Sequence, residues 1–308
     1  MGKLDSISPN PVMREYAQGA AQSAILPVAD FIAPPVEVAT SVGQYKSYTE
    51  KNRFHIPDTA RAIGGPATQL SFEASDLTYN CKPHALDFPV DNLEAIETAQ
   101  LENMLMEGAR AVAEVAALSH EKTVVDAALA AAGAGTDLTL GTDDLVDGLD
   151  DQLLAMAKVA KYGSIMNIGI VFGATAFKSW KNDVSVKNRY NGGIRGNQRM
   201  ISPGIDDVSG LLVGNPDARV TYTVYDANGP GEADSINFVL DNSILVFARN
   251  PSPSRRDPSF MKTFRLAGQW MVPGSYMSPD GRVEFAKYDW SEDVKVTNSA
   301  AVSRINLV

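Results

Sequence analysis

The sequence has few of the residues that catalytic and metal sites usually need. Its 308 residues include three histidines (His55, His84 and His120) and a single cysteine, Cys81. No two histidines stand four residues apart and no cysteine pair exists, so the ligand spacings of zinc sites are missing. One cysteine also excludes an intrachain disulfide, which fits a reducing compartment. We therefore expect no metal and no cofactor.

The motifs of common enzyme classes are missing too. G-x-x-x-x-G-K-[ST], G-x-G-x-x-G, G-x-S-x-G and H-E-x-x-H do not occur. His84 lies close to Cys81, but closeness in sequence is not catalytic geometry, so we interpret Cys81 as a thiol at a strand end. The aspartates from Asp137 to Asp151 lack the spacing of a calcium loop, and a helix N-terminus explains most of them. We expect the protein not to be an enzyme.

Long apolar runs and excess positive charge are likewise lacking. No apolar run reaches the roughly 18 residues of a membrane-spanning helix, and the N-terminus has no secretory apolar region. The net charge of −10 disfavours sequence-independent binding to nucleic acid. The opening "MGKLDS" fits a myristoylation pattern at Gly2 and Ser6, which we attribute to chance.

The chain does have enough apolar residues, 44%, for a large core. Residues 1–33 contain several prolines and no sustained periodicity, which indicates an extended arm that needs a partner surface. Further on, Leu70, Phe72 and Ala74 alternate with polar residues, as in a half-buried strand. We expect a polar two-stranded hairpin there, which must lie on another surface because such a hairpin is marginal alone.

A helix from Asp91 to Leu118 is the longest element expected. Asp91 and Glu94 form a capping box, and Pro89 stands before the helix begins. One face carries an apolar stripe: Leu93, Ile96, Leu101, Met104, Leu105, Val112, Val115 and Ala116. Another face carries a polar ridge, which we expect to face a neighbouring subunit or a lumen: Asn103, Glu107, Arg110 and Glu114.

The remaining pattern mixes helices and strands. Acidic residues early and Lys158 and Lys161 late predict a second helix from Asp143 to Gly163. The stretch "NIGIVFGATAFKSWKN" predicts a strand, a turn at Gly173 and a helix, and "ARVTYTVYDA" predicts a strand. The apolar run from Ile244 to Ala248 predicts a strand buried on both faces. Without repeats or sustained βαβ alternation, the fold class is α+β.

Two basic loops are candidate contact sites. We interpret "KNRYNGGIRGNQR" and "ARNPSPSRRDPSF" as loops at subunit interfaces, with nucleic-acid contact as the alternative. Together with the helix ridge, they supply most of the candidate subunit-interface residues, which are Asn103, Glu107, Arg110, Glu114, Arg61, Arg189, Arg195 and Arg199.

Four stretches of the sequence, taken in their order along the chain, resemble a known protein family. The first is "FIAPPVEVATSVGQYKSYTEKNRFHIPDTARAIGG", with a Pro-Val opening and G-x-Y-x-x-Y. The second is the long helix, and the third is "NIGIVFGATAFKSWKNDVSVKNR". The fourth is "DNSILVFARNPSPSRRDPSFMKTFRLAG", an apolar strand followed by P-S-F-x-x-T-F. Together they resemble the major capsid proteins of tailed bacteriophages with the Hong-Kong-97-type fold, in the branch with short N-termini.

The resemblance implies a domain plan. It comprises an N-terminal arm (1–33), a first strand of the peripheral domain (34–50), an extended loop (51–81) and the peripheral domain with its long spine helix (82–134). An axial domain (135–281) follows, and a C-terminal strand (282–308) returns to the peripheral domain. The short N-terminus implies no fused scaffold domain, and no cross-linking residue pair carries over.

The resemblance also implies a structural function. Such proteins self-assemble into hexamers and pentamers that form an icosahedral shell around packaged double-stranded DNA, which they enclose without reading its sequence. Implied partners are further copies, scaffold and portal proteins, and decoration proteins, with assembly in the host cytoplasm and a final location in the virion capsid. The alternatives are an enzyme with an unrecognised acidic site and another virion component. A cleft that holds His55 or His84 among carboxylates would favour the enzyme.

Overall fold

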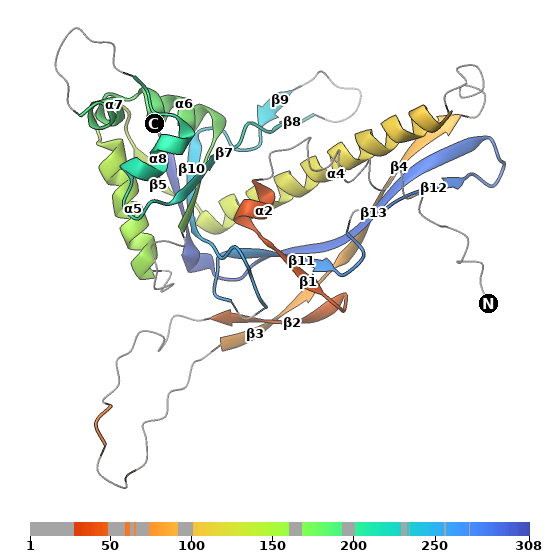
Figure 1. Cartoon of the computed structure of the whole chain (residues 1–308), viewed down its shortest axis with the longest axis horizontal. Coiled ribbons are helices and arrows are strands. Elements are labelled where there is room, and N and C mark those ends of the chain that lie inside the picture. Colours follow the sequence, from red (N-terminus) through yellow and green to blue (C-terminus); the bar gives the residue numbers. More distant parts are fainter. Residues whose placement is uncertain are drawn as a thin grey trace.

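The computed structural model of the chain describes residues 28–48, 59–61, 65, 74–91, 101–159, 168–192, 201–228, 233, 235–255, 257–270 and 272–308. These residues form two parts, each built around a five-stranded sheet (Figure 1). One part is elongated and carries a long helix along its sheet. The other part is more compact and has several short helices around its sheet.

The sheet of the elongated part has the order β1-β11-β13-β12, and β4 also pairs with β13. Its strands are β1 (Pro35–Val38), β4 (Lys82–Asp91), β11 (Met261–Leu266), β12 (Val272–Met277) and β13 (Val283–Val296). β1 runs parallel to β11, and the other pairs are antiparallel. We expected 135–281 to form the axial domain, but β11 and β12 belong to this sheet.

The long helix α4 (Leu101–Ala132) packs on this sheet. With 32 residues it is about 48 Å long. In the first half of the helix, buried side chains recur at helical spacing and meet Val90 of β4 and Trp290 of β13; they are Leu105, Ala109, Val112, Ala113 and Ala116. Several of these are alanines, which let the helix backbone approach the strands closely.

The boundaries and the stripe of α4 differ from the sequence prediction. The helix continues beyond Leu118 to Ala132 and is followed by Gly133 with a φ of +69°, a conformation that glycine adopts easily. Asp91 is the last residue of β4 and pairs with Val283. Residues 92–100, including Glu94, lie outside the described part. Val115 is 54% exposed and does not belong to the buried stripe.

The sheet of the compact part has the order β5-β14-β10-β6-β7. Its strands are β5 (Thr136–Leu138), β6 (Ile168–Phe172), β7 (Asp217–Val220), β10 (Ser243–Ala248) and β14 (Val302–Leu307). All of β10 is buried, which confirms the two-faced strand expected from its apolar run. Helices α5 (Leu145–Val159), α6 (Ala174–Asn182), α7 (Val184–Tyr190) and α8 (Ile205–Leu211) complete this part.

The turn between β6 and α6 requires glycine, as the strand–turn–helix prediction implied. A Cβ atom on Gly173 would lie 2.1 Å from the carbonyl oxygen of Asp241. The expected strand "ARVTYTVYDA" instead forms two short strands, β7 and β8 (Val224–Asp226). The second of these leaves the sheet and pairs with β9 (Ile236–Phe238).

We expected the C-terminal segment to return to the sheet beneath the long helix as one strand, and it does so only in part. Residues 282–308 form two strands, and only β13 pairs with β4 beneath the long helix. The last strand, β14, lies between β10 and β5 in the compact part. The short helical turn Ser299–Ala301 separates the two strands. The end of the chain therefore links both parts of the molecule.

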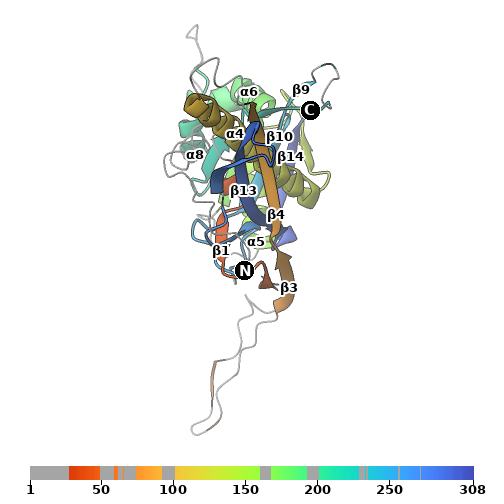
Figure 2. The same cartoon turned by 90° about the vertical axis from the view of Figure 1, so that its right-hand side faces the viewer.

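A two-stranded ribbon, β2 (Val42–Tyr48) and β3 (Ala74–Asn80), leaves the elongated part on one side. Its base is fixed by Tyr45 and Tyr79, whose rings lie 5.3 and 4.7 Å from that of Phe264. Figures 1 and 2 show the ribbon and the β8–β9 hairpin on opposite sides of the body. Residues 1–27 of the arm expected at 1–33, most of the extended loop and the alternating residues Leu70 and Phe72 lie outside the described part. The end of the expected arm, residues 28–33, is instead mostly buried in the core and contains the short helix α2 (Ala29–Ile32). None of the described helices is long and apolar enough to cross a membrane.

Candidate functional site

The polar ridge of α4 faces solvent in the described part. Glu107 and Arg110 are exposed, and Glu114 is partly exposed. Arg110 Nε donates to Glu114 Oε1 at 2.8 Å across one helical turn. Exposed pairs of this kind contribute little to folding stability, so the ridge is available for contacts outside the subunit. The side chain of Asn103, the remaining ridge residue, lies outside the described part.

Arg189 forms ion pairs within its own subunit and lies in a helix, where the sequence predicted a loop at a subunit interface. It lies in the last turn of α7, and its guanidinium contacts Asp144 at 3.2 Å and Asp147 at 2.5 Å. Asp144 in turn accepts the N–H of Val146 at the start of α5. Arg189 therefore ties α7 to the N-terminus of α5, whose acidic residues serve helix capping as expected.

The other arginine candidates have no described contact to a partner surface. Arg61 is exposed and donates to the carbonyl oxygen of Gly65 at 2.8 Å, a contact between residues four positions apart. Arg195 and Arg199 lie outside the described residues. The interface roles of all three thus stay predictions.

A polar pocket of about 460 Å³ lies beside Arg189, between the start of α5 and the start of α7. Asp183 is buried there, and its carboxylate accepts the N–H groups of Gly141 at 2.9 Å and Ser185 at 2.8 Å. This carboxylate caps α7 and holds the preceding loop, so backbone groups already use its oxygens. Among the described residues, no group of His, Cys, Asp and Glu side chains has the arrangement of a metal site.

A buried polar cluster joins the two parts of the molecule and was not predicted. His120 of α4 is 6% exposed, and its Nδ1 lies 2.8 Å from Glu292 Oε2 of β13. On the other side, the guanidinium of Arg265 of β11 contacts Asp30 at 2.6 Å and His120 Nε2 at 3.3 Å. Arg265 also lies 3.5 Å from the ring centroid of Trp270, a cation–π contact. The cluster thus connects α4 and its sheet to α2 (Ala29–Ile32).

Mutual contacts set the charges in this cluster. Burial alone would lower the pKa of His120, but hydrogen bonds to Asp30 and Glu292 outweigh it and raise this pKa. Burial would raise the pKa values of Asp30 and Glu292, but both pKa values are lowered, chiefly through the hydrogen bond of each to His120. The cluster therefore favours the charged forms of its histidine and these two carboxylates.

Glu121 fixes α2 from the neighbouring position of α4. It is 1% exposed, and its Oε2 accepts the N–H of Ala29 at 2.7 Å. Burial raises the pKa of Glu121 to about 7. One sequence signal could have identified this site: His120 follows Ala116 by one helical turn, on the buried stripe of α4. A histidine on an apolar stripe indicates buried partners.

The histidine and cysteine near the ribbon do not form a reactive pair. Cys81 is buried between β3 and β4, and burial raises its thiol pKa to about 11. Its Sγ donates to the carbonyl oxygen of Phe264 at 3.5 Å. The ring of His84 stacks on Trp290 at 5.2 Å. Cys81 lies between the end of β3 and the start of β4, as the interpretation of a thiol at a strand end predicted. His55 lies outside the described part.

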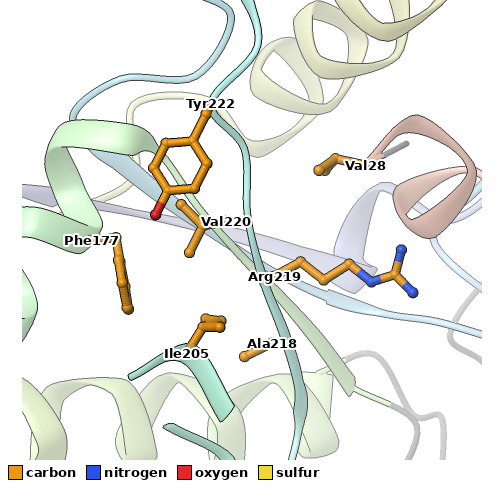
Figure 3. Close-up of a pocket in the computed structure, with 7 residues that line it drawn as sticks. All are labelled: Val28, Phe177, Ile205, Ala218, Arg219, Val220 and Tyr222. Carbon is orange, nitrogen blue, oxygen red and sulfur yellow. The ribbon is translucent and has the colours of Figure 1, made fainter. Parts of the chain in front are cut away.

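An apolar pocket of about 310 Å³ opens between α2, α6, α8 and β7 (Figure 3). Its lining residues are Val28, Phe177, Ile205, Ala218, Arg219, Val220 and Tyr222. The Arg219 side chain points away from Phe177 and places its guanidinium over the ring of Phe31, 4.3 Å from the centroid. Apart from the hydroxyl of Tyr222, the remaining lining is apolar and suits an apolar group.

No protein-family model and no curated protein matches the chain. Among solved structures, a phage-related protein from Bordetella bronchiseptica RB50 superposes with a TM-score of 0.70 at 18% identity over 98% of each chain. The virus-like particle from Pyrococcus furiosus gives 0.56 at 11% identity over 98% of this chain and 100% of that chain. The mature capsid of bacteriophage PhiM1 gives a TM-score of 0.53 at 11% identity, over 89% of this chain and 84% of that chain.

These likenesses show the fold. The chain has the α+β fold of tailed-phage capsid proteins, the Hong-Kong-97-type fold, as the four sequence stretches predicted. The match includes both five-stranded sheets, because it extends over nearly the whole chain in the first two comparisons.

Proposed function

We propose that the chain is the major capsid protein of a tailed bacteriophage, a structural subunit and not an enzyme. The observation that carries the proposal is the near-complete structural overlap with proteins that include a mature phage capsid and a virus-like particle. The subunits would form hexamers and pentamers that close into an icosahedral shell around packaged double-stranded DNA.

The shape of the subunit supports this function. The long helix and its sheet make a flat, elongated body, and the β2–β3 ribbon extends from one side (Figure 1). Shells of this kind are held by many modest contacts repeated by symmetry, so no single surface needs to be large or strongly apolar. The exposed ridge at Glu107, Arg110 and Glu114 is one surface of this type, and we retain it as a candidate interface.

The strand pairing supports a revised division into domains. We assign 34–48, 82–132 and 261–296 to the peripheral domain, because these segments contain α4 and its sheet. Residues 135–255 and 297–308 form the axial domain around β10. The extended loop keeps its proposed range of 51–81 and lies over an adjacent subunit, and the proposed arm is shortened to 1–27, because most of residues 28–33 are buried in the core of this subunit.

Charge supports the proposed relation to DNA. The net charge of −10 disfavours tight binding to phosphates, so packed DNA can move against the shell without adhering to it. We further propose scaffold and portal proteins, with decoration proteins, as partners during assembly in the host cytoplasm. The mature location would be the virion capsid.

Electron microscopy of the purified protein tests the proposal. We expect closed shells, tubes or ring-shaped capsomers. A protein that stays strictly monomeric at high concentration, also with a molecular crowder present, contradicts the proposal.

A further inference from the structure

The β8–β9 hairpin stands apart from the rest of the fold. Within the described part its two strands pair only with each other, outside both five-stranded sheets. Each strand has three residues, Val224–Asp226 and Ile236–Phe238. A two-stranded hairpin alone is marginally stable in water, so other contacts must hold it in place.

The two faces of the hairpin have different surroundings. In the strand register Tyr225 pairs with Asn237, while Val224 pairs with Phe238. Because side chains alternate along a strand, Tyr225 lies on the opposite face from Val224 and Phe238. Tyr225 packs against the main hydrophobic cluster, and Lys122 Nζ of α4 lies 4.3 Å from its ring centroid. The face of Tyr225 is thus the inner face, held by α4.

The outer face is apolar and is exposed among the described residues. Val224 is 45% exposed, Ile236 60% and Phe238 40%. These side chains belong to none of the three hydrophobic clusters found among the described residues. Together they expose on the order of 300 Å² of apolar surface, at the lower end of the size range of the largest patches on monomeric proteins, which are often functional.

The size of this face indicates what kind of contact it makes. A stable interface buries about 800 Å² per partner, so a face of less than half that area would not hold a dimer by itself. It suits one contact among several that a closed assembly repeats. The hairpin also lies opposite the β2–β3 ribbon (Figure 1), and a subunit in a ring meets its two neighbours through two different sides.

We propose that the outer face of the β8–β9 hairpin packs against a second copy of this chain in the assembled shell. Aromatic side chains with few charges typify the centre of such contacts, and Phe238 supplies one here. The only charged side chain at a paired position of this face is Asp226, which receives the N–H groups of Asn228 and Ser235 at 3.0 and 2.9 Å. This inference rests on the proposed shell function.

The first test compares two substitutions on the same strand. Ile236→Asp places a charge on the outer face, and the control Asn237→Asp places the same charge on the inner face, one residue away. We expect Ile236→Asp to lower the yield of sedimenting particles by about tenfold or more, equivalent to about 1.4 kcal/mol, while Asn237→Asp changes it by less than about twofold. Thermal unfolding of the soluble subunits should match the wild type for both. Particles of Ile236→Asp at wild-type yield would overturn the inference.

The second test does not depend on a destabilising charge. Ile236→Cys introduces a thiol on the outer face, whereas the native Cys81 is 3% exposed. We expect maleimide to label the introduced thiol at least about tenfold more slowly in assembled particles than in dissociated subunits, because a close-packed interface excludes the reagent. Equal labelling rates would refute the contact while leaving the shell function intact. If the wild type itself forms no assemblies, the shell function fails and this inference fails with it.

Discussion

Replacing Glu121 by glutamine should change how the stability of the subunit depends on pH. Glu121 is buried in α4, anchors Ala29, and has a pKa of about 7 instead of 4.5. A folded-state pKa above the unfolded value means that the folded subunit binds the proton more tightly. The resulting stability is fully present below pH 4.5 and is lost as the pH rises through 7. A difference of this size corresponds to about 3 kcal/mol.

The glutamine side chain cannot ionise, so the variant lacks this loss. The free energy of unfolding of Glu121→Gln, relative to wild type, should therefore rise by about 3 kcal/mol between pH 4.5 and pH 8. His120 also has a raised pKa, so its contribution is present below its ordinary pKa and lost as the pH rises through the folded value. Asp30 and Glu292 have lowered pKa values, so their contributions are lost toward acidic pH. These three groups are common to both proteins and largely cancel in the comparison.

The assay is urea unfolding of dissociated subunits at pH 4.5 and pH 8, followed by tryptophan fluorescence. Trp270 and Trp290 contact the cluster and report on its integrity. Glu114→Gln is the matched control, because Glu114 lies on the same helix and is partly exposed. If the difference between wild type and Glu121→Gln stays within about 0.5 kcal/mol across this pH range, the raised pKa of Glu121 and its burial at α2 are wrong.

Three further changes should have distinct effects. Trp180→Ala removes a fully buried ring. It should lower the free energy of unfolding, measured in denaturant, by about 3–5 kcal/mol. A decrease below about 1 kcal/mol would contradict the place of Trp180 in the core. Gly173→Ala should lower the free energy of unfolding by about 2 kcal/mol or more in the same assay, because the Cβ of the alanine would lie 2.1 Å from the Asp241 carbonyl oxygen. A variant as stable as the wild type would show that the β6–α6 turn can adjust. Replacing residues 49–73 by a short Gly-Ser linker should leave circular dichroism unchanged and abolish particles in sedimentation; an unfolded monomer would disprove the extended-loop assignment.

Local patterns sufficed for some elements. The apolar run of β10 is buried on both faces, and Gly173 marks the turn into α6, as the sequence indicated. Both signals depend on neighbouring residues alone. The stripe of α4 was also visible, since Leu105, Val112 and Ala116 recur at helical spacing and are buried.

Long-range strand pairing was not visible in the sequence. Asp91 ends β4, which pairs with β13 along ten residues, although the sequence indicated only the start of a helix there. Asp91 pairs with Val283, which is distant in the sequence, and local propensity cannot anticipate such a partner. For the same reason the pattern of the last strand could not indicate which sheet β14 would join.

The candidate site shows the same limit. Arg189 was identified as a basic loop residue, but its partners Asp144 and Asp147 lie at the start of another helix. The buried cluster escaped notice because Asp30, His120 and Glu292 come from three distant segments. The outer face of β8–β9 depends on register, because only the pairing of Val224 with Phe238 shows that both lie on one side.

Electron microscopy of the wild-type protein, purified without partners, is the decisive test of the proposed shell function. We predict closed shells or capsomers with five-fold and six-fold symmetry, in which β8–β9 hairpins lie at contacts between subunits. Folded monomers alone, at every concentration and salt condition tested, would contradict this function.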